Sequence, residues 1–297
     1  MNIFITGSNG FVGKNVIHYF KHKNTIFTYE RNQMINIKQD VVLHFAGKAH
    51  DLNTIRNHEE YYKANTDLTK NLFNSFLVSN AKIFIFISTV KAVVDKADHE
   101  ITEDDNPNPK NHYGKSKLLA EEYILSKKLQ DGKRFFILRP CMIHGPGNKG
   151  NLNLLYSIIS KGLPWPLGAF ENKRSFCSID NLCFIINELI NNDKIASGVY
   201  NIADNDAMST NELISLIAQS QNKKFKIWNV PKSIILMFSK LGDLFSLPLT
   251  TERLNKLTET YIVSNNKIKN AINKPLPVST KEGLLKTFDS FNKMMTR

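Results

Sequence analysis

The chain has 297 residues, of which 42% are apolar and 22% are charged. This balance excludes disordered and fibrous proteins, and the length suits one large domain or two interlocked domains with a sizeable buried core. Lys and Arg number 39 against 27 Asp and Glu, which gives a net charge of +12. The lysines are scattered without a dense tract or an aromatic-and-basic ladder, so we expect no nucleic-acid partner.

Cysteine usage and apolar runs indicate the cellular setting. Cys141, Cys177 and Cys183 have neither the number nor the spacing of a disulfide framework or a zinc site, so no metal is expected. No apolar run approaches the ~18 residues of a membrane span, and the first residues lack the charged leader of a signal peptide. We therefore expect a soluble, cytoplasmic protein without a membrane span.

In the first half of the chain, short apolar runs alternate with amphipathic stretches. The runs predict strands buried on both faces, at residues 3–6, 26–29, 41–45, 83–88 and 135–138. The amphipathic stretches predict helices, at residues 12–23, 65–80 and 113–129. Because parallel neighbours need a crossover connection, this order predicts an α/β fold built on a doubly wound parallel sheet.

The alternation of expected strands and helices ends after Pro140, where loops rich in Gly and Pro follow. Further elements are expected as one strand and two helices, at residues 198–203, 209–220 and 280–291. No repeat or low-complexity linker separates two units, so we predict interleaved lobes. The expected first domain comprises residues 1–145 with 175–203 returning to it, and a smaller α+β substrate lobe comprises residues 146–174 and 204–297.

The first expected strand leads into a glycine-rich turn that opens a helix and reads Gly7-Ser8-Asn9-Gly10-Phe11-Val12-Gly13. Glycine permits the tight turn, lets a pyrophosphate approach the backbone and allows helix and strand to pack closely. The helix N-terminus offers free N–H groups to the phosphates. The first domain is therefore expected to be a Rossmann dinucleotide-binding domain, with contacts from Gly7, Asn9, Gly10, Phe11, Val12 and Gly13.

The end of the second expected strand carries Glu30 and Arg31. An acidic residue there would bind ribose hydroxyls and an arginine would bind a 2′-phosphate, and we favour Arg31 with NADP(H) over Glu30 with NAD(H). Only about ten residues separate Glu30 from Val41, too few for a full crossover and a strand. We expect at most a short strand at 35–37 and an abbreviated adenine side of the pocket.

A Tyr-x-x-x-Lys pattern occurs three times, at Tyr19/Lys23, Tyr113/Lys117 and Tyr123/Lys127. In a Lys-rich chain the pattern alone carries little information, so its position has to decide. Only Tyr113 follows a polar, Pro-containing loop at the start of a new helix, about two dozen residues after Thr89. Tyr113 and Lys117 lie on one helix face.

Thr89, Tyr113 and Lys117 together predict hydride transfer at a carbinol or ketone. Lowering the pKa of a phenol by ~3 units takes ~4 kcal/mol, of which an ammonium about 5 Å away supplies roughly 3 kcal/mol. We expect Lys117 to lower the pKa of Tyr113 and to bind the ribose of the dinucleotide. Tyr113 would act as acid or base on the substrate oxygen, with Thr89 hydrogen-bonded to that oxygen.

The chain resembles extended short-chain dehydrogenases/reductases of the nucleotide-sugar 4-epimerase and 4-ketoreductase type, within the NAD-dependent epimerase/dehydratase family. Beyond the glycine turn and Tyr113-Gly114-Lys115-Ser116-Lys117, the landmarks follow in family order, as His44-Phe45-Ala46-Gly47, Ser88-Thr89-Val90, Leu138-Arg139-Pro140, His144-Gly145-Pro146-Gly147 and Arg174-Ser175-Phe176. The similarity spans nearly the whole chain, including a tail at residues 261–277.

The resemblance implies further contacts and a homodimer. The dinucleotide would also touch Phe45, Ala46, Gly47 and Pro140. A UDP-sugar would be bound by Lys91, Tyr113, Asn151, Arg174 and Arg253. An arginine suits a bidentate phosphate contact, although Arg174 could equally be a surface residue and Asn151 a helix cap. Asp180 and Asn181 could be no more than a helix start, and relatives pair through helices that match residues 65–80 and 113–129.

Several reactions remain open. A 4,6-dehydratase needs Asp-Glu directly after the Thr, and Val90-Lys91 stand there instead. We favour a UDP-4-keto-hexose 4-reductase of surface polysaccharide synthesis, acting on an N-acetylated or 6-deoxy sugar, because the short 30–41 connection should weaken dinucleotide retention. The alternatives are a UDP-glucose or UDP-N-acetylglucosamine 4-epimerase with tightly held NAD, and a non-catalytic dinucleotide-binding regulator.

One apolar stretch, at residues 233–249, contains Lys240 and Asp243. We interpret it as core or lobe packing, and association with a membrane surface is the alternative.

Overall fold

A six-stranded parallel sheet forms the centre of the molecule. The computed structural model describes residues 1–30, 33–49, 58–148, 150–245 and 249–295, and it describes Asn151 and residues 293–295 by their backbone alone. The strand order is β2-β1-β3-β4-β5-β8. The strands are β1 (Asn2–Thr6), β2 (Thr25–Thr28), β3 (Val41–His44), β4 (Ile83–Ile87), β5 (Arg134–Pro140) and β8 (Gly198–Ile202). Every neighbouring pair is parallel, so the predicted doubly wound sheet is confirmed.

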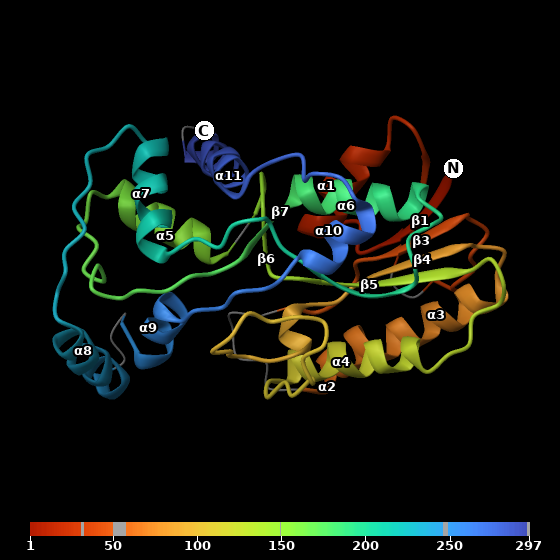
Figure 1. The fold of residues 1–297 in the computed structure, drawn as a ribbon, viewed down its shortest axis with the longest axis horizontal. Coiled ribbons are helices and arrows are strands. Elements are labelled where there is room, and N and C mark those ends of the chain that lie inside the picture. Colours follow the sequence, from red (N-terminus) through yellow and green to blue (C-terminus); the bar gives the residue numbers. More distant parts are fainter. Residues whose placement is uncertain (31–32, 50–57, 149, 246–248, 296–297) are drawn as a thin grey trace.

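Helices cover both faces of the sheet (Figure 1). One face carries α1 (Phe11–Phe20), α6 (Ile179–Asn191) and α10 (Asn266–Ile272). The opposite face carries α3 (Leu68–Val78) and α4 (His112–Leu125). A short helix, α2 (Glu59–Tyr61), and a π-helical segment, η1 (Tyr62–Asp67), lead into α3, and a 3₁₀ turn, η2 (Val90–Ala92), follows β4.

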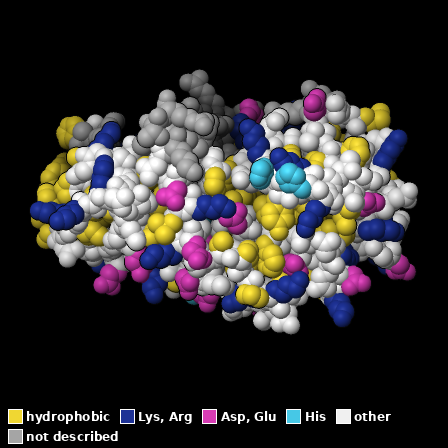
Figure 2. Space-filling model, turned by 90° about the horizontal axis from the view of Figure 1, so that it is seen from above, with side chains coloured by type: hydrophobic (Ala, Val, Ile, Leu, Met, Phe, Trp, Pro, Cys, Tyr) yellow, Lys and Arg dark blue, Asp and Glu magenta, His cyan; other side chains and the backbone are white. Residues whose placement is uncertain are grey.

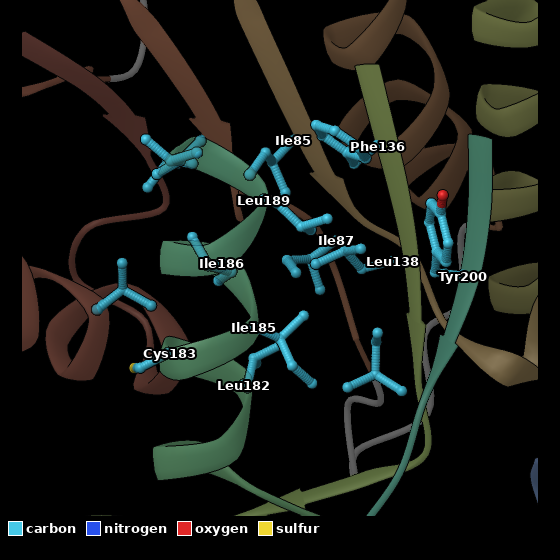
Figure 3. Packing of buried hydrophobic residues seen from close by; sticks show 14 of the residues in the cluster. Ile85, Ile87, Phe136, Leu138, Leu182, Cys183, Ile185, Ile186, Leu189 and Tyr200 are labelled. Atoms are coloured by element: carbon cyan, nitrogen blue, oxygen red, sulfur yellow. The ribbon is translucent and has the colours of Figure 1, made fainter. Parts of the chain in front are cut away.

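The packing of α6 shows how a late segment of the chain is tied to the sheet (Figure 3). Its buried side chains, Leu182, Ile185, Ile186 and Leu189, lie against β4, β5 and β8, where Ile85, Ile87, Phe136, Leu138 and Tyr200 complete the cluster. Burying such a side chain stabilises the fold by about 1.5–3 kcal/mol. This cluster therefore anchors α6 firmly, although α6 follows β5 by about forty residues.

A second core lies away from the sheet, on the left of Figure 1. It is built from helices α5 (Asn151–Ser160), α7 (Thr210–Ser220), α8 (Lys232–Phe245), α9 (Thr251–Thr258) and α11 (Thr280–Met295). A two-stranded parallel ladder of β6 (Met142–His144) and β7 (Phe176–Ser178) lies between this core and the sheet (Figure 1). Tyr156, Ile214 and Phe288 are buried at its centre.

Two expectations for the first half, for β2 and for the helix from residue 65, were wrong in detail, and the short strand allowed at 35–37 does not form. β2 is not buried on both faces, because it forms the edge of the sheet, and Phe27 on it is exposed. Residues 33–40 contain no strand, although Ile37 is buried against α3. The helix expected from residue 65 starts earlier and is π-helical at residues 62–67, a local change of hydrogen bonding that hydrophobic periodicity does not reveal.

Among the described residues, no helix is both long and apolar enough to cross a membrane.

Candidate active site

The glycine turn after β1 has the tight geometry expected of a phosphate-binding loop. Gly7 has φ +72°, and an added Cβ there would lie 2.5 Å from the Ala46 nitrogen at the end of β3. A Cβ on Gly13 would lie 2.2 Å from the Gly7 carbonyl oxygen, so α1 packs directly on the turn. At Gly10 the nearest such atom is 3.3 Å away, and Gly10 is exposed. Gly7 and Gly13 are thus required by packing, and the exposed Gly10 leaves the backbone before the helix open to solvent.

This open space lies at the N-terminus of α1. Gly10 is the N-cap and makes no side-chain hydrogen bond, so the first N–H groups of the helix face outward without an internal acceptor. Asn9 is exposed beside it, whereas Phe11 and Val12 are half-buried. A diphosphate fits this arrangement, because it accepts hydrogen bonds from helix N-termini.

The other predicted dinucleotide residues lie at neighbouring strand ends. Phe45, Ala46 and Gly47 follow β3, which pairs with β1, and Pro140 is the buried last residue of β5. Glu30 is exposed just after the edge strand β2, and Arg31 lies outside the described residues. Since parallel strands end at one edge of the sheet, these positions lie with the glycine turn at the edge where sheets of this kind bind dinucleotides in a crevice.

Tyr113 and Thr89 meet at the carboxyl end of β4. Tyr113 is half-buried in the first turn of α4, where the Asn111 side chain caps the helix, and its phenol is hydrogen-bonded to the Thr89 hydroxyl. The ring of Tyr61 packs 6.3 Å away, centroid to centroid. The Tyr123 hydroxyl instead donates to Asn74 on α3, so the two Tyr-x-x-x-Lys patterns of α4 have different surroundings.

Lys117 is buried one turn after Tyr113. Its ammonium donates to the Ile87 carbonyl oxygen at 2.8 Å and lies 4.6 Å from the centre of the Phe86 ring. Gly47 passes directly over it, because an added Cβ would lie 3.1 Å from Nζ. The chain thus brings Thr89, Tyr113 and Lys117 together beside the crevice.

The pKa values differ from the expectation that Lys117 would lower that of Tyr113. Burial raises the pKa of Tyr113 above its ordinary value, and the hydrogen bond from Thr89 only partly opposes this. Burial also lowers the pKa of Lys117 to about 8. Desolvation therefore has the largest effect on the pKa of both groups. The expectation that Lys117 lowers the pKa of Tyr113 was wrong for the protein alone.

Sequence reasoning missed Asn65, which is buried in the π-helical segment. Its side chain accepts from the Lys48 N–H at 2.7 Å and donates to the Ser116 hydroxyl at 2.9 Å. It therefore holds the loop after β3 against α4, next to Lys117. Nothing in the sequence around Asn65 marks this position, because the contact depends on the π-helical turn.

Lys91 and Arg174 approach each other across Tyr261. The Lys91 ammonium lies 4.0 Å from the centre of the Tyr261 ring, and Arg174 forms a bridge with the Tyr261 backbone. Burial lowers the pKa of Lys91, and the nearby guanidinium adds to this effect while Asp95 and Glu259 oppose it. Two half-buried cations that influence each other and both border Tyr261 suit an anionic ligand.

The remaining predicted residues are dispersed. Arg174 donates from Nη1 to the Lys256 carbonyl at the end of α9, and Arg253 is exposed one turn earlier on that helix. Asn151 begins α5, whose N-cap is Gly150, so its interpretation as a cap was wrong.

Asp180 and Asn181 do lie at a helix start, in the first turn of α6 behind the Ser178 cap. Asn181 donates to the buried Asp204 carboxylate at 2.6 Å.

Comparison with known proteins agrees with this geometry. The sequence pattern of the NAD dependent epimerase/dehydratase family matches residues 3–203, which include the glycine turn, Tyr113 and Lys117. The chain belongs to this family. The resemblance drawn from the sequence is therefore confirmed, as is the expectation that the chain is an enzyme of this family.

Two relatives in this family match over most of their length. A UDP-glucose 4-epimerase of Vibrio cholerae is 30% identical over 98% of this chain and 95% of its own. An N-acetyl-alpha-D-glucosaminyl-diphospho-ditrans,octacis-undecaprenol 4-epimerase of Escherichia coli O157:H7 is 28% identical over 90% of this chain and 84% of its own.

Solved structures of low identity share the fold. The UDP-glucuronic acid 4-epimerase of Bacillus cereus, in complex with NAD, has a TM-score of 0.76 at 18% identity and covers 99% of both chains. RMD of Pseudomonas aeruginosa, complexed with NADPH, has a TM-score of 0.74 at 20% identity and covers 98% of this chain and 99% of its own.

Proposed function

We propose that the protein transfers hydride at C4 of a UDP-activated hexose, with Tyr113 moving the proton of the C4 oxygen. The observation that carries this proposal is the contact between the Tyr113 phenol and the Thr89 hydroxyl beside the buried ammonium of Lys117. A hydroxyl pair of this kind can hold a substrate oxygen and exchange a proton with it. Val90-Lys91 after Thr89 provide no acid pair for elimination.

Each side chain has a separate task in the proposed reaction. Because burial raises its pKa, Tyr113 keeps its proton at neutral pH and can donate it to a keto oxygen. Thr89 orients the same oxygen, and Lys117 is held by the Ile87 carbonyl so that its remaining N–H groups can bind ribose hydroxyls. A nicotinamide dinucleotide, when bound, supplies the hydride donor or acceptor and, in its oxidised form, a positive charge.

The glycine turn fits the diphosphate of that dinucleotide. Gly10 leaves space in front of the free N–H groups of α1, and Gly7 and Gly13 keep this turn tight. Neither Glu30 nor Arg31 decides between NAD(H) and NADP(H), so our preference for NADP(H) stays a prediction.

We favour 4-epimerisation of the two finer activities, because both relatives described above, which match 98% and 90% of this chain, carry the name 4-epimerase. The 4-ketoreductase predicted from the sequence stays the second candidate. It is favoured by the exposed edge strand β2 and by residues 33–40, which form no further strand to cover the adenine side. Fewer contacts there would let the dinucleotide leave between turnovers.

We further propose that the second core belongs to the substrate lobe, formed by residues 146–174 and 204–297. Lys91 and Arg174 would bind the diphosphate of the UDP-sugar, because they are half-buried cations that both border Tyr261. Asn151 and Arg253 would contribute from α5 and α9. A homodimer through α3 and α4 is in keeping with exposed apolar residues there, namely Val78, Leu119 and Leu125.

The test is mass spectrometry of the dinucleotide that remains bound after purification, followed by sugar assays. Stoichiometric NAD that does not exchange, with interconversion of UDP-glucose and its C4 epimer or of the N-acetylated pair, would support the epimerase. Reduction of a 4-keto UDP-sugar with exchangeable NADPH or NADH would support the reductase. Failure of both reactions with a dinucleotide bound would contradict the proposal and favour a non-catalytic regulator.

A further inference from the structure

Helix α8 presents a broad apolar face to solvent. Only three of its residues are buried, namely Ile235, Ser239 and Gly242. Seven large apolar side chains are exposed instead: Leu236, on the side of the lysines, and six that share another side of the helix, Ile234, Met237, Phe238, Leu241, Leu244 and Phe245. The exposed fraction reaches 73% for Leu244 and 65% for Phe245. Monomeric proteins seldom group such residues on one surface without a binding partner.

The α8 side chains divide into three faces when successive residues are set about 100° apart. The buried residues form a narrow stripe. The six exposed apolar residues that share one side fill an arc of about 120° beside it, which we call the α8 apolar arc. Lys232, Ser233, Lys240 and Asp243 lie on the third face. An apolar arc beside a polar, lysine-bearing face is typical of helices that lie in the plane of a membrane interface.

The attachment of α8 to the body holds this arc outward. Gly242 contacts the chain before α9 so closely that an added Cβ would lie 1.8 Å from the Leu249 carbonyl oxygen. The Asp243 carboxylate accepts from the Thr251 N–H at 3.0 Å, at the start of α9. These two contacts use the stripe and the polar face and not the arc.

The α8 helix lies at one end of the molecule, far from the sheet (Figure 1). Figure 2 shows the molecule from above, with hydrophobic and basic side chains side by side at its left-hand end, whereas α8 lies at the lower left of Figure 1, on the side away from that view. Docking through this end would leave the crevice at the sheet accessible.

The charge around the α8 apolar arc favours an anionic partner. Residues 221–245 contain five lysines and one aspartate, a net charge of +4, from Lys223, Lys224, Lys226, Lys232, Lys240 and Asp243. All five lysines are exposed. A symmetric dimer through the α8 apolar arc would bring two such basic segments close together, and their like charges would repel each other. Anionic lipid headgroups attract lysines placed in this way.

We propose that α8 docks the protein on an anionic membrane surface, with its apolar arc among the acyl chains next to the headgroups and its lysines at the lipid phosphates. This surface is separate from the proposed active site, so the inference stands independently of the sugar chemistry. The sequence led us to interpret the apolar stretch at residues 233–249 as core or lobe packing, whereas we now propose that its exposed side chains bind a membrane.

The test is flotation of the full chain with vesicles of phosphatidylglycerol and phosphatidylethanolamine, compared with vesicles of phosphatidylcholine alone. We expect binding to the anionic vesicles that weakens as salt is raised. The Leu244→Ser/Phe245→Ser variant should bind about a hundredfold more weakly, because two exposed apolar side chains no longer enter the interface. Met34→Ser/Leu154→Ser removes two exposed apolar residues elsewhere and should bind like the wild type.

Three results would overturn the proposal. One is a wild-type protein that stays with the soluble fraction at low salt. Another is equal binding of the α8 variant and the wild type. The third is light scattering that finds a dimer which the α8 variant alone dissociates, without any vesicle binding, since a second copy would then cover the arc. Thermal unfolding of both variants checks that they are folded, and their exposed positions predict unchanged midpoints.

Discussion

The Lys117 ammonium donates a hydrogen bond to the Ile87 carbonyl oxygen at 2.8 Å, which ties helix α4 to the last residue of strand β4. Thr89 lies two residues beyond Ile87 and is hydrogen-bonded to Tyr113, which lies on α4 together with Lys117. The contacts Lys117–Ile87 and Tyr113–Thr89 thus hold the proposed proton donor, Tyr113, beside Thr89. A phenol held in this way needs little rearrangement to act on a bound oxygen.

Tyr113→Phe should bind the dinucleotide with wild-type affinity but lose about a thousandfold in turnover, because the proton donor is removed and the ring is kept. Turnover of the sugar and dinucleotide affinity are measured on the same preparation. Tyr123→Phe is the matched control. Tyr123 lies on α4 and also precedes a lysine by four residues, but its hydroxyl donates a hydrogen bond to Asn74. Retained activity in Tyr113→Phe would remove this residue from the mechanism.

Gly10→Ala and Gly13→Ala separate binding from packing in the glycine turn. Gly10→Ala should lower the thermal midpoint far less than Gly13→Ala, because its Cβ would meet the Gly7 oxygen at a tight 3.3 Å and not at 2.2 Å. It should weaken dinucleotide binding by tenfold or more, at about 1.4 kcal/mol per factor of ten. Gly13→Ala should lower the midpoint strongly, because its Cβ would be 2.2 Å from the Gly7 oxygen. Wild-type dinucleotide affinity in Gly10→Ala would show that the diphosphate binds elsewhere.

Lys117→Met should change how stability depends on pH. In the unfolded chain Lys117 keeps its proton up to about pH 10.5, whereas in the folded protein it loses the proton from about pH 8. Between these values the unfolded chain binds more protons, so the contribution of Lys117 to the free energy of unfolding rises with pH. Relative to Lys117→Met, the wild type should gain at most about 3 kcal/mol between pH 8 and pH 10.5.

Denaturant unfolding measures the free energy of unfolding of both proteins at pH 7.5 and pH 9.5, on either side of the Lys117 pKa of about 8. A wild-type protein that loses stability relative to Lys117→Met over this interval would contradict the lowered pKa of Lys117.

Arg139→Met should destabilise the protein by about 3–5 kcal/mol, because it leaves a buried carboxylate without its cation. Glu121 is fully buried, accepts from Arg139 through two guanidinium nitrogens, and also receives the Ser88 hydroxyl. The double variant Arg139→Met/Glu121→Met should recover most of this loss. If it is as unstable as the single variant, the loss comes from packing and not from the unpaired charge.

Of the three Tyr-x-x-x-Lys patterns, the predicted fold indicated the one at Tyr113 as the pattern that lies near Thr89. A strand end bearing Thr89 and a helix starting near Tyr113 follow from periodicity and the polar loop, and the structure brings these residues into contact. The spacing of the glycines likewise predicted a tight turn, which Gly7 and Gly13 require.

The remaining features depend on tertiary contacts that periodicity does not encode. The exposure of β2 follows from its place at the sheet edge, and the contacts of Asn65 follow from a π-helical turn. The pKa of Tyr113 could not be predicted from its distance to Lys117 along the helix, because burial outweighs the charge. The apolar residues of α8 looked like core in the sequence, since side chains that face water and side chains that face a core share one period.

The most direct test of the central claim is nuclear magnetic resonance of the sugar formed in deuterated water, from UDP-hexoses and from 4-keto UDP-sugars with the dinucleotide. If hydride moves at C4 and Tyr113 handles only the proton on oxygen, the product carries protium at C4 and no solvent deuterium on any ring carbon. Tyr113→Phe should form almost none of it. Solvent deuterium at C4 or a neighbouring carbon, or a wild-type rate in Tyr113→Phe, would contradict the account.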